Sequence, residues 1–534
     1  MRIKSTRLLL SDAKLYLLLG IASLQPVANF VHANIIDQAF VLNRPVGYFA
    51  VIFATASLAF LVTNLICGVK DKFIVAFAIA LAVLFFFNNH IIEALFLDIG
   101  EKLFGVFVRF RYVLLGQGVL YLLILFGVRK IHPSRQFANI ALCSLAVVPA
   151  IDLAVVVPDL GAQSTPKKLV EFEIPPPLDS GKQSPSQDVK PNVYLIIPDG
   201  LPAPENISTI LDGYEYELPN QLKRLGFRMV EESNTNGLTT YASIVTLYSM
   251  QYIFEDGEEV NADKHAAILE TFKGNNPVVG GFRSRGYRYF QADAGYHITG
   301  CSGYEDVCLA LPGMLRSLDL VFLERTVIGR ISDMINQGFE MPDVVERLPA
   351  KEEGPFYLQA HVSMPHIPFR YDSDCSKYDV HVYPYMADLK RWRDILGKQV
   401  RCAERQLYQL ADAIIKKDPE AIIVIQADHG IAHVAHRPVA ENDESALSQF
   451  KYTNEDIRLM RGIFTSFYLP DSCASDLRAG LSPVNTFRIV FACLDGRSPD
   501  LLTDDRTFMI EDYRYVKEIY PDATGVPARS ERYR

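Results

Sequence analysis

Several short segments of this sequence place metal-binding side chains directly after apolar runs. Residues 421–426 lead into Asp428 and His429, residues 192–198 lead into Asp199, and residues 356–360 lead into His361. Unbroken apolar runs of this kind are typical of strands buried on both faces of a parallel sheet. Open α/β sheets bind their ligands just beyond the carboxyl ends of such strands. These side chains are therefore candidates for one common site.

Each of these signals also has a purely structural explanation. Asp199 could be a turn aspartate that caps the following helix. Asp428 and His429 are adjacent, and side chains alternate between the two faces of a regular strand. Both could bind one metal only if the strand breaks there, which Gly430 permits.

A hydroxyl-rich segment opens a predicted helix further along the chain. Gly237 supplies a loop, and Thr239, Thr240 and Ser243 precede apolar residues with helical spacing. Hydroxyls at a helix N-terminus commonly act as caps. The same position also binds anions, because free backbone N–H groups and the helix dipole favour phosphate. A hydroxyl held there beside a divalent cation becomes a nucleophile.

Histidines gather in two short segments near the predicted strand ends. His366 lies between two prolines that restrict its backbone, close to His361, while His433 and His436 follow His429. An isolated histidine is usually structural. Five histidines in two such segments instead indicate a site that uses imidazole.

The first part of the chain is predicted to cross a membrane. We expect five spans, since a helix needs about 20 apolar residues to cross the hydrocarbon; they cover residues 14–33, 46–68, 73–90, 112–128 and 137–157. A cleaved signal peptide and buried core helices are the alternatives. Residues 91–111 are either an amphipathic helix on the outer membrane surface or a polar-flanked extension of spans three and four.

Basic residues predict the orientation of these spans. Lysine and arginine are concentrated at the N-terminus and in the loops at 69–72 and 129–136. The positive-inside rule places these parts in the cytoplasm. An odd number of spans then delivers everything after residue 157 to the opposite side.

Composition divides the chain into four parts. Residues 1–157 form the predicted transmembrane domain, and residues 158–191 have the Pro- and Ser-rich composition of a linker. Residues 192–505 form the predicted catalytic domain, and residues 506–534 a polar, loosely ordered tail. The net charge of −9, without a basic stripe, argues against a nucleic-acid partner.

Six cysteines fall in the predicted outer domain, where an oxidising compartment favours disulfides. We expect pairing between neighbours in the sequence, with free buried thiols as the alternative; the pairs are Cys301–Cys308, Cys375–Cys402 and Cys473–Cys493.

Taken in order, Asp199 at a strand end, Thr240 at a helix start, His366 in Pro-His-Ile-Pro-Phe and the Asp428-His429-Gly430 triplet resemble the alkaline phosphatase/sulfatase superfamily. The preceding spans make the chain similar to the membrane-bound branch, which includes lipoteichoic acid synthases and phosphoethanolamine transferases. The resemblance implies an α/β fold: a five-helix transmembrane bundle followed by a doubly wound mixed α/β sheet domain. The Cys/Ser-x-Pro-x-Arg motif of sulfate ester hydrolases is missing from the sequence.

The resemblance also implies roles for individual residues. Asp199, Thr240, Asp428 and His429 are expected to bind one divalent cation, Zn²⁺ or Mn²⁺ rather than Mg²⁺. Thr240, preferred over Thr239, is the expected nucleophile, and His366 the residue that holds the phosphate or leaving group. His361, His433 and His436 are expected either to line the pocket or to hold a second metal.

Three functions are compatible with these expectations. By resemblance, the first is a transferase in the bacterial inner membrane with a periplasmic catalytic domain. It would move phosphoglycerol or phosphoethanolamine from a membrane phospholipid to an envelope glycan or lipid through a phosphothreonine intermediate. The second is a phosphoester or sulfate ester hydrolase. The third is a non-catalytic membrane scaffold.

Overall fold

The computed structural model describes the ordered elements of the chain in two separate compact units. The described residues are 2–34, 43–67, 72–89, 110–131, 142–155, 190–292, 299–309, 322–323, 325–327, 354–366, 369–382, 389–431, 451–511, 515–519 and 526–527. The first unit comprises Met1–Thr165 and Leu318–Ile335, and the second comprises Pro166–Ser317 and Asn336–Arg534. The predicted linker and residues 91–109 lie outside the described residues, apart from the linker's last two positions.

Apolar helices build the first unit. They are α1 (Arg2–Asn34), α2 (Asn43–Cys67), α3 (Lys72–Phe87), α5 (Phe110–Ile131) and a helix whose apolar stretch is Leu142–Val155. Among the described residues, Ala13–His32 and Pro45–Ile66 are long and apolar enough to cross a membrane. The other three predicted spans correspond to shorter apolar helices, within Lys72–Phe87, Val113–Gly127 and Leu142–Val155. Two candidate spans are thus found, and the five-helix bundle stays a prediction.

A short segment far along the sequence belongs to this first unit. Phe322 is 6% exposed and lies against Phe30, Tyr48 and Phe87, which come from three different helices. Arg325 lies over the Phe30 ring, 5.3 Å from its centroid. No feature of the sequence indicated that this segment groups with the N-terminal helices.

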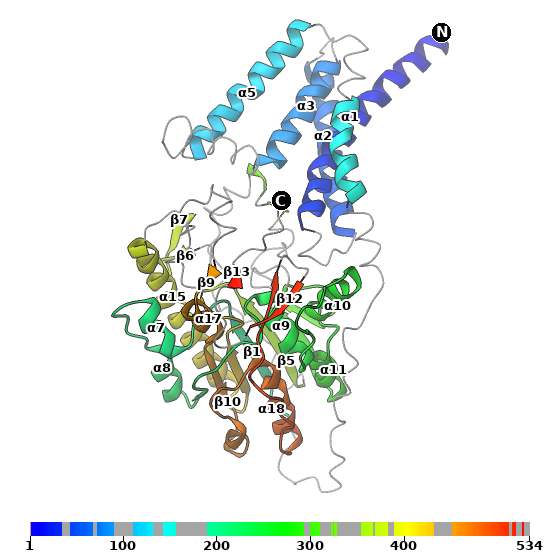
Figure 1. The fold of residues 1–534 in the computed structure, drawn as a ribbon. Coiled ribbons are helices and arrows are strands. Elements are labelled where there is room, and N and C mark those ends of the chain that lie inside the picture. Colours follow the sequence, from blue (N-terminus) through cyan, green and yellow to red (C-terminus); the bar gives the residue numbers. More distant parts are fainter. Residues whose placement is uncertain are drawn as a thin grey trace. The chain divides into compact units, whose positions relative to one another are not determined.

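A mixed seven-stranded sheet organises the second unit (Figure 1). Its strand order is β2 (Arg228–Met229), β10 (Thr465–Tyr468), β8 (Ile422–Gln426), β1 (Val193–Pro198), β5 (Phe356–Val362), β3 (Arg288–Ala292) and β4 (Val307–Leu309). The strands from β8 to β4 run parallel, whereas β10 is antiparallel to both of its neighbours. Among the other described strands, β6 (Phe369–Tyr371) pairs with β7 (Lys377–Val382), and β9 (Lys451–Tyr452) pairs with β13 (Val526–Pro527). A third pair lies near the C-terminus and is described below.

Helices cover both faces of this sheet. On β1, Val193, Leu195 and Ile197 join one buried core, while Tyr194 and Ile196 join another. The first core includes residues of α9 (Thr240–Ser249), α10 (Ala262–Phe272), α11 (Pro277–Ser284) and α18 (Pro483–Asp495), and the second includes residues of α8 (Leu218–Arg224) and α15 (Leu389–Lys417). The structure also has α7 (Pro204–Ile210), α17 (Asn454–Arg461) and the 3₁₀ helix η5 (Asp471–Asp476). This layering confirms the predicted mixed α/β sheet domain.

All three expected disulfides form in the second unit. They join Cys301 to Cys308, Cys375 to Cys402 and Cys473 to Cys493. The pairing between sequence neighbours is therefore confirmed.

Regular structure continues beyond residue 505, where the catalytic domain was expected to end. Strand β11 (Phe508–Glu511) pairs with β12 (Tyr515–Glu518), and Phe508 is fully buried in the core that contains α9. The N–H of Leu238 donates to the Phe508 carbonyl at 2.9 Å, so this hairpin supports the loop before Thr240. The average polarity of the tail concealed two short apolar runs.

Gly430 lies close against the backbone of neighbouring segments, which leaves no room for a side chain. Its φ is not in the left-handed region. An added Cβ would lie 2.1 Å from the Leu459 carbonyl oxygen and 2.6 Å from that of Gly462. Strand β8 has already ended at Gln426, so the break in the strand precedes this glycine.

We therefore expect Gly430→Ala to lower the melting temperature, because overpacking against backbone costs about 1–3 kcal/mol. Gly280→Ala in α11 is the matched control, since its Cβ would meet nothing within 4 Å. That control should stabilise the chain by about 0.5–1 kcal/mol through helix propensity. Equal melting of Gly430→Ala and the parent protein would contradict the close approach.

Candidate metal centre

The carboxyl ends of three adjacent parallel strands bring the candidate residues together. Strand β1 lies between β5 and β8, and their register pairs Ile197 with His361 and Ile196 with Ile425. Asp199 directly follows β1, and Asp428 lies two residues beyond the end of β8. Residues distant in sequence therefore meet at one edge of the sheet, as the strand-end pattern predicted.

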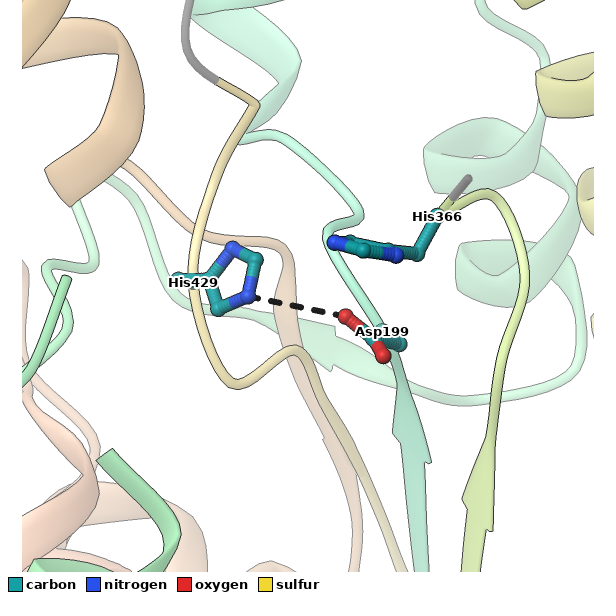
Figure 2. A group of neighbouring side chains, drawn as sticks. All are labelled: Asp199, His366 and His429. Carbon is teal, nitrogen blue, oxygen red and sulfur yellow. Dashed lines mark ion pairs between the residues drawn. The ribbon is translucent and has the colours of Figure 1, made fainter. Parts of the chain in front are cut away.

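Two buried carboxylates form the centre of this cluster. Asp199 and Asp428 are 1% and 2% exposed. His361 Nε2 lies 3.8 Å from a carboxylate oxygen of each aspartate, and His429 Nε2 lies 3.5 Å from one of each. Figure 2 shows Asp199, His366 and His429 pointing toward one another from three separate chain segments.

One oxygen of each carboxylate has no hydrogen-bond donor. Asp428 Oδ1 accepts the backbone N–H groups of Gly200 and His429, at 3.0 and 2.9 Å. Asp428 Oδ2 and Asp199 Oδ1 are buried and accept no hydrogen bond. Buried polar atoms are nearly always satisfied, so such a pair of oxygens beside imidazole nitrogens indicates a cation site.

Hydrogen bonds to their Nδ1 atoms orient the two imidazoles. His429 Nδ1 lies 2.8 Å from the Gly430 carbonyl oxygen, which can only accept, so Nδ1 carries the proton and Nε2 the lone pair. His361 Nδ1 lies 2.8 Å from Thr299 Oγ1. Contacts of this kind fix the ring orientation of metal-binding histidines.

The electrostatics of the cluster favour a cation. Burial and the charge of Asp428 raise the pKa of Asp199 above its ordinary value. Burial would also raise the pKa of Asp428, but His429, His361 and the Gly200 N–H lower it instead. Burial lowers the pKa of His361 despite both aspartates, which leaves its imidazole neutral and able to bind a metal.

Thr240 is the first residue of α9 and faces this cluster. Its Oγ1 lies 3.3 Å from His429 Nε2, whereas the Thr239 side chain caps the helix by accepting the Ala242 N–H. Gly237 allows the approach, because a Cβ there would lie 2.3 Å from the Ser243 nitrogen. The geometry distinguishes the two threonines, with Thr240 at the cluster.

His366 borders the other side of the cluster. Its N–H donates to the Asp199 carbonyl at 3.1 Å, and its ring centroid lies 5.8 Å from that of His429. Ligand atoms of Asp199, His366 and His429 all lie within 4.8 Å of one another, as do those of Asp199, His361 and Asp428. The site can therefore hold a cation with carboxylate and imidazole ligands, a set that suits Zn²⁺ or Mn²⁺.

The sequence left two expectations for His361, lining the pocket or holding a second metal. The structure places this side chain between the two aspartates, 1% exposed. The register of β5 against β1 determines this position, and the sequence alone does not specify the register. His433 and His436 lie outside the described residues.

Comparisons with known proteins give structural likenesses at low sequence identity. No protein-family model and no curated protein matches the chain. The zinc complex of the periplasmic domain of EptC from Escherichia coli is similar at 13% identity, covering 68% of this chain and 98% of that one, with a TM-score of 0.40.

Two further solved structures are similar. The integral membrane protein EptA, a lipooligosaccharide phosphoethanolamine transferase from Neisseria meningitidis, is 13% identical over 90% of this chain and 95% of its own, with a TM-score of 0.35. The lipoteichoic acid synthase LtaP from Listeria monocytogenes is 14% identical over 63% and 83%, with a TM-score of 0.36.

We expect opposite effects of Asp199→Asn with and without metal. In chelator the substitution should raise the melting temperature, because it removes a buried charge that repels Asp428. With Zn²⁺ it should abolish the metal-dependent rise, which amounts to about 2.7 kcal/mol at 100 times the dissociation constant in the parent protein. Asp412→Asn, on α15, is the matched control, and an equal zinc response in both variants would contradict the site.

The zinc affinity should also decrease as the pH decreases, over a range set by the pKa of His429. Burial would lower the pKa of His429, but Asp428 and Asp199 raise it above the ordinary 6.5 in the metal-free protein. Protons compete with metal for the imidazole below that raised pKa. Calorimetric titration should therefore show zinc binding weakening from above pH 6.5 downward, and constant affinity from pH 8 to 6 would contradict the assignment.

Proposed function

We propose that this chain is a membrane-anchored, metal-dependent phosphotransferase of the alkaline phosphatase/sulfatase superfamily. The observation that supports this best is the hydroxyl of Thr240 at a helix start, 3.3 Å from His429 Nε2 and beside two buried carboxylates. Phosphoryl transfer requires positioned opposite charge around the phosphate more than covalent chemistry. A hydroxyl at a helix N-terminus beside a candidate cation site meets that requirement.

Each residue of the site has a separate role in this reaction. A cation bound by Asp199, Asp428 and His429 would lower the pKa of the Thr240 hydroxyl and neutralise phosphate charge. The Thr240 hydroxyl loses its proton to solvent, its Oγ1 attacks phosphorus, and the bond from phosphorus to the diacylglycerol oxygen breaks. Protonated His366 donates a proton to that leaving oxygen. The acceptor hydroxyl next returns a proton to His366 while its oxygen attacks phosphorus. The bond from phosphorus to Thr240 Oγ1 breaks, and this oxygen regains its proton from solvent.

The proposed donor is a membrane phospholipid, and the group carried is phosphoethanolamine or phosphoglycerol. The proposed acceptor is an envelope glycan or lipid on the periplasmic side of the bacterial inner membrane. The apolar N-terminal helices support a lipid donor, because such a donor arrives in the plane of the bilayer. With water as the acceptor, the same steps describe a hydrolase.

The full chain in detergent, loaded with Zn²⁺ or Mn²⁺, should acquire the mass of one headgroup phosphate on the Thr240 peptide. Labelled phosphatidylethanolamine and phosphatidylglycerol are the two donors to compare. Thr240→Ala should abolish the adduct and lower turnover on the order of 10⁴-fold or more, as expected for loss of a nucleophile.

Thr239→Ala provides the matched control. It removes the helix cap at a cost of about 1 kcal/mol in stability but should retain the adduct. Label released only as free headgroup would favour the hydrolase. Unchanged turnover in Thr240→Ala would refute the proposed nucleophile.

A further inference from the structure

In addition to the candidate metal centre, the second unit contains a buried arginine. Arg461, the last residue of α17, is 7% exposed. Its Nε donates to Thr507 Oγ1 at 3.1 Å, and no carboxylate of the described residues lies within ion-pair distance of it. Burial lowers the pKa of Arg461, and the charge of Asp505 only partly opposes that effect. A guanidinium that is largely withdrawn from water is stabilised by an anionic partner.

This guanidinium lines a cavity of about 450 Å³. Arg458, one turn earlier on α17, lines the same cavity and donates to Asn206 Oδ1 at 2.6 Å. Asn234 and Asn454 add amide groups to the wall. Glu455 also lines the cavity, with its Oε1 4.0 Å from Arg458 Nη2, and its side chain is 60% exposed.

Backbone hydrogen bonds connect the cavity wall to segments of the candidate metal centre. The Thr235 N–H donates to the Arg461 carbonyl at 2.8 Å, and the Gly430 N–H donates to the Met460 carbonyl at 2.7 Å. The Thr235 hydroxyl makes a very short hydrogen bond to the Asp428 carbonyl. The end of α17 therefore holds both the loop before Thr240 and the segment that carries the metal ligands.

We infer that this cavity is a subsite for an oxyanion, a phosphate or carboxylate, carried by the acceptor. The acceptor assignment rests on the proposed function. In the proposed reaction the donor carries one phosphate, and that phosphate lies at Thr240. We therefore assign the second anion site to the acceptor. Two guanidinium groups with neighbouring amides provide the charge-assisted donors that oxyanions require.

Anion binding can be tested without the reaction. Glucose 1-phosphate and glucuronate are titrated by calorimetry into the full chain in detergent with chelator present, so that no cation recruits an anion to the two aspartates. Saturable binding is expected. Arg461→Gln should weaken it about 10- to 100-fold, the range for a charge-assisted hydrogen bond. The sugar that binds more tightly identifies the oxyanion.

Companion variants separate binding from folding. Arg458→Gln changes a half-exposed residue and should also weaken binding, whereas Glu455→Gln should strengthen it by removing a like charge. Arg224→Gln, an exposed arginine on α8, is the matched control and should bind as the parent does. No binding of either sugar, or equal binding by the parent, Arg461→Gln and Arg458→Gln, would overturn the subsite.

Steady-state kinetics with metal then test the acceptor assignment. In Arg458→Gln the KM for the acceptor should rise about tenfold or more, while the KM for the lipid donor stays the same. A rise confined to the donor would refute that assignment even if the sugars bind. Thr240→Ala should lose turnover and still bind the sugar, so the two proposals can fail separately.

Discussion

The structure of the second unit depends on two carboxylates that the fold brings together at one buried site. Asp199 and Asp428 are almost fully removed from water, and one oxygen of each lacks a hydrogen-bond donor. Like charges in such surroundings raise the free energy of the folded chain unless a proton or a cation intervenes. Much of the surrounding structure keeps this arrangement in place. The amides of Gly200 and His429 fix Asp428, while Gly430 lets its segment lie against the backbone of α17.

The sequence revealed much of this arrangement because strand ends are local signals. The apolar runs before Asp199, His361 and Asp428 correspond to β1, β5 and β8, three neighbours in the sheet. Parallel strands of an α/β sheet end at one edge, so proximity followed from the pattern. In the sequence, the preference for Thr240 over Thr239 rested on the resemblance. In the structure the two threonines differ in their contacts: the Thr239 side chain caps the helix, and Thr240 Oγ1 lies near His429.

The parts that sequence reasoning missed depend on register and on distant packing. The position of His361 between the two aspartates follows from its alignment with Ile197, which no local property of either strand encodes. The β11–β12 hairpin was hidden by the charges around it, although Phe508 and Ile510 alternate as expected of a half-buried strand. The burial of Arg461 has no local signal in the sequence, because residues more than 40 positions away, such as Thr507, contribute to it.

The grouping of Phe322 with the N-terminal helices has a practical consequence for the preparation of the second unit alone. Phe322 is covered by aromatic rings of α1, α2 and α3. A fragment that begins after residue 191 would keep this phenylalanine and lose all three rings that cover it. The exposed ring would favour self-association. Replacing Phe322 with a polar side chain is the simplest way to keep such a fragment monomeric.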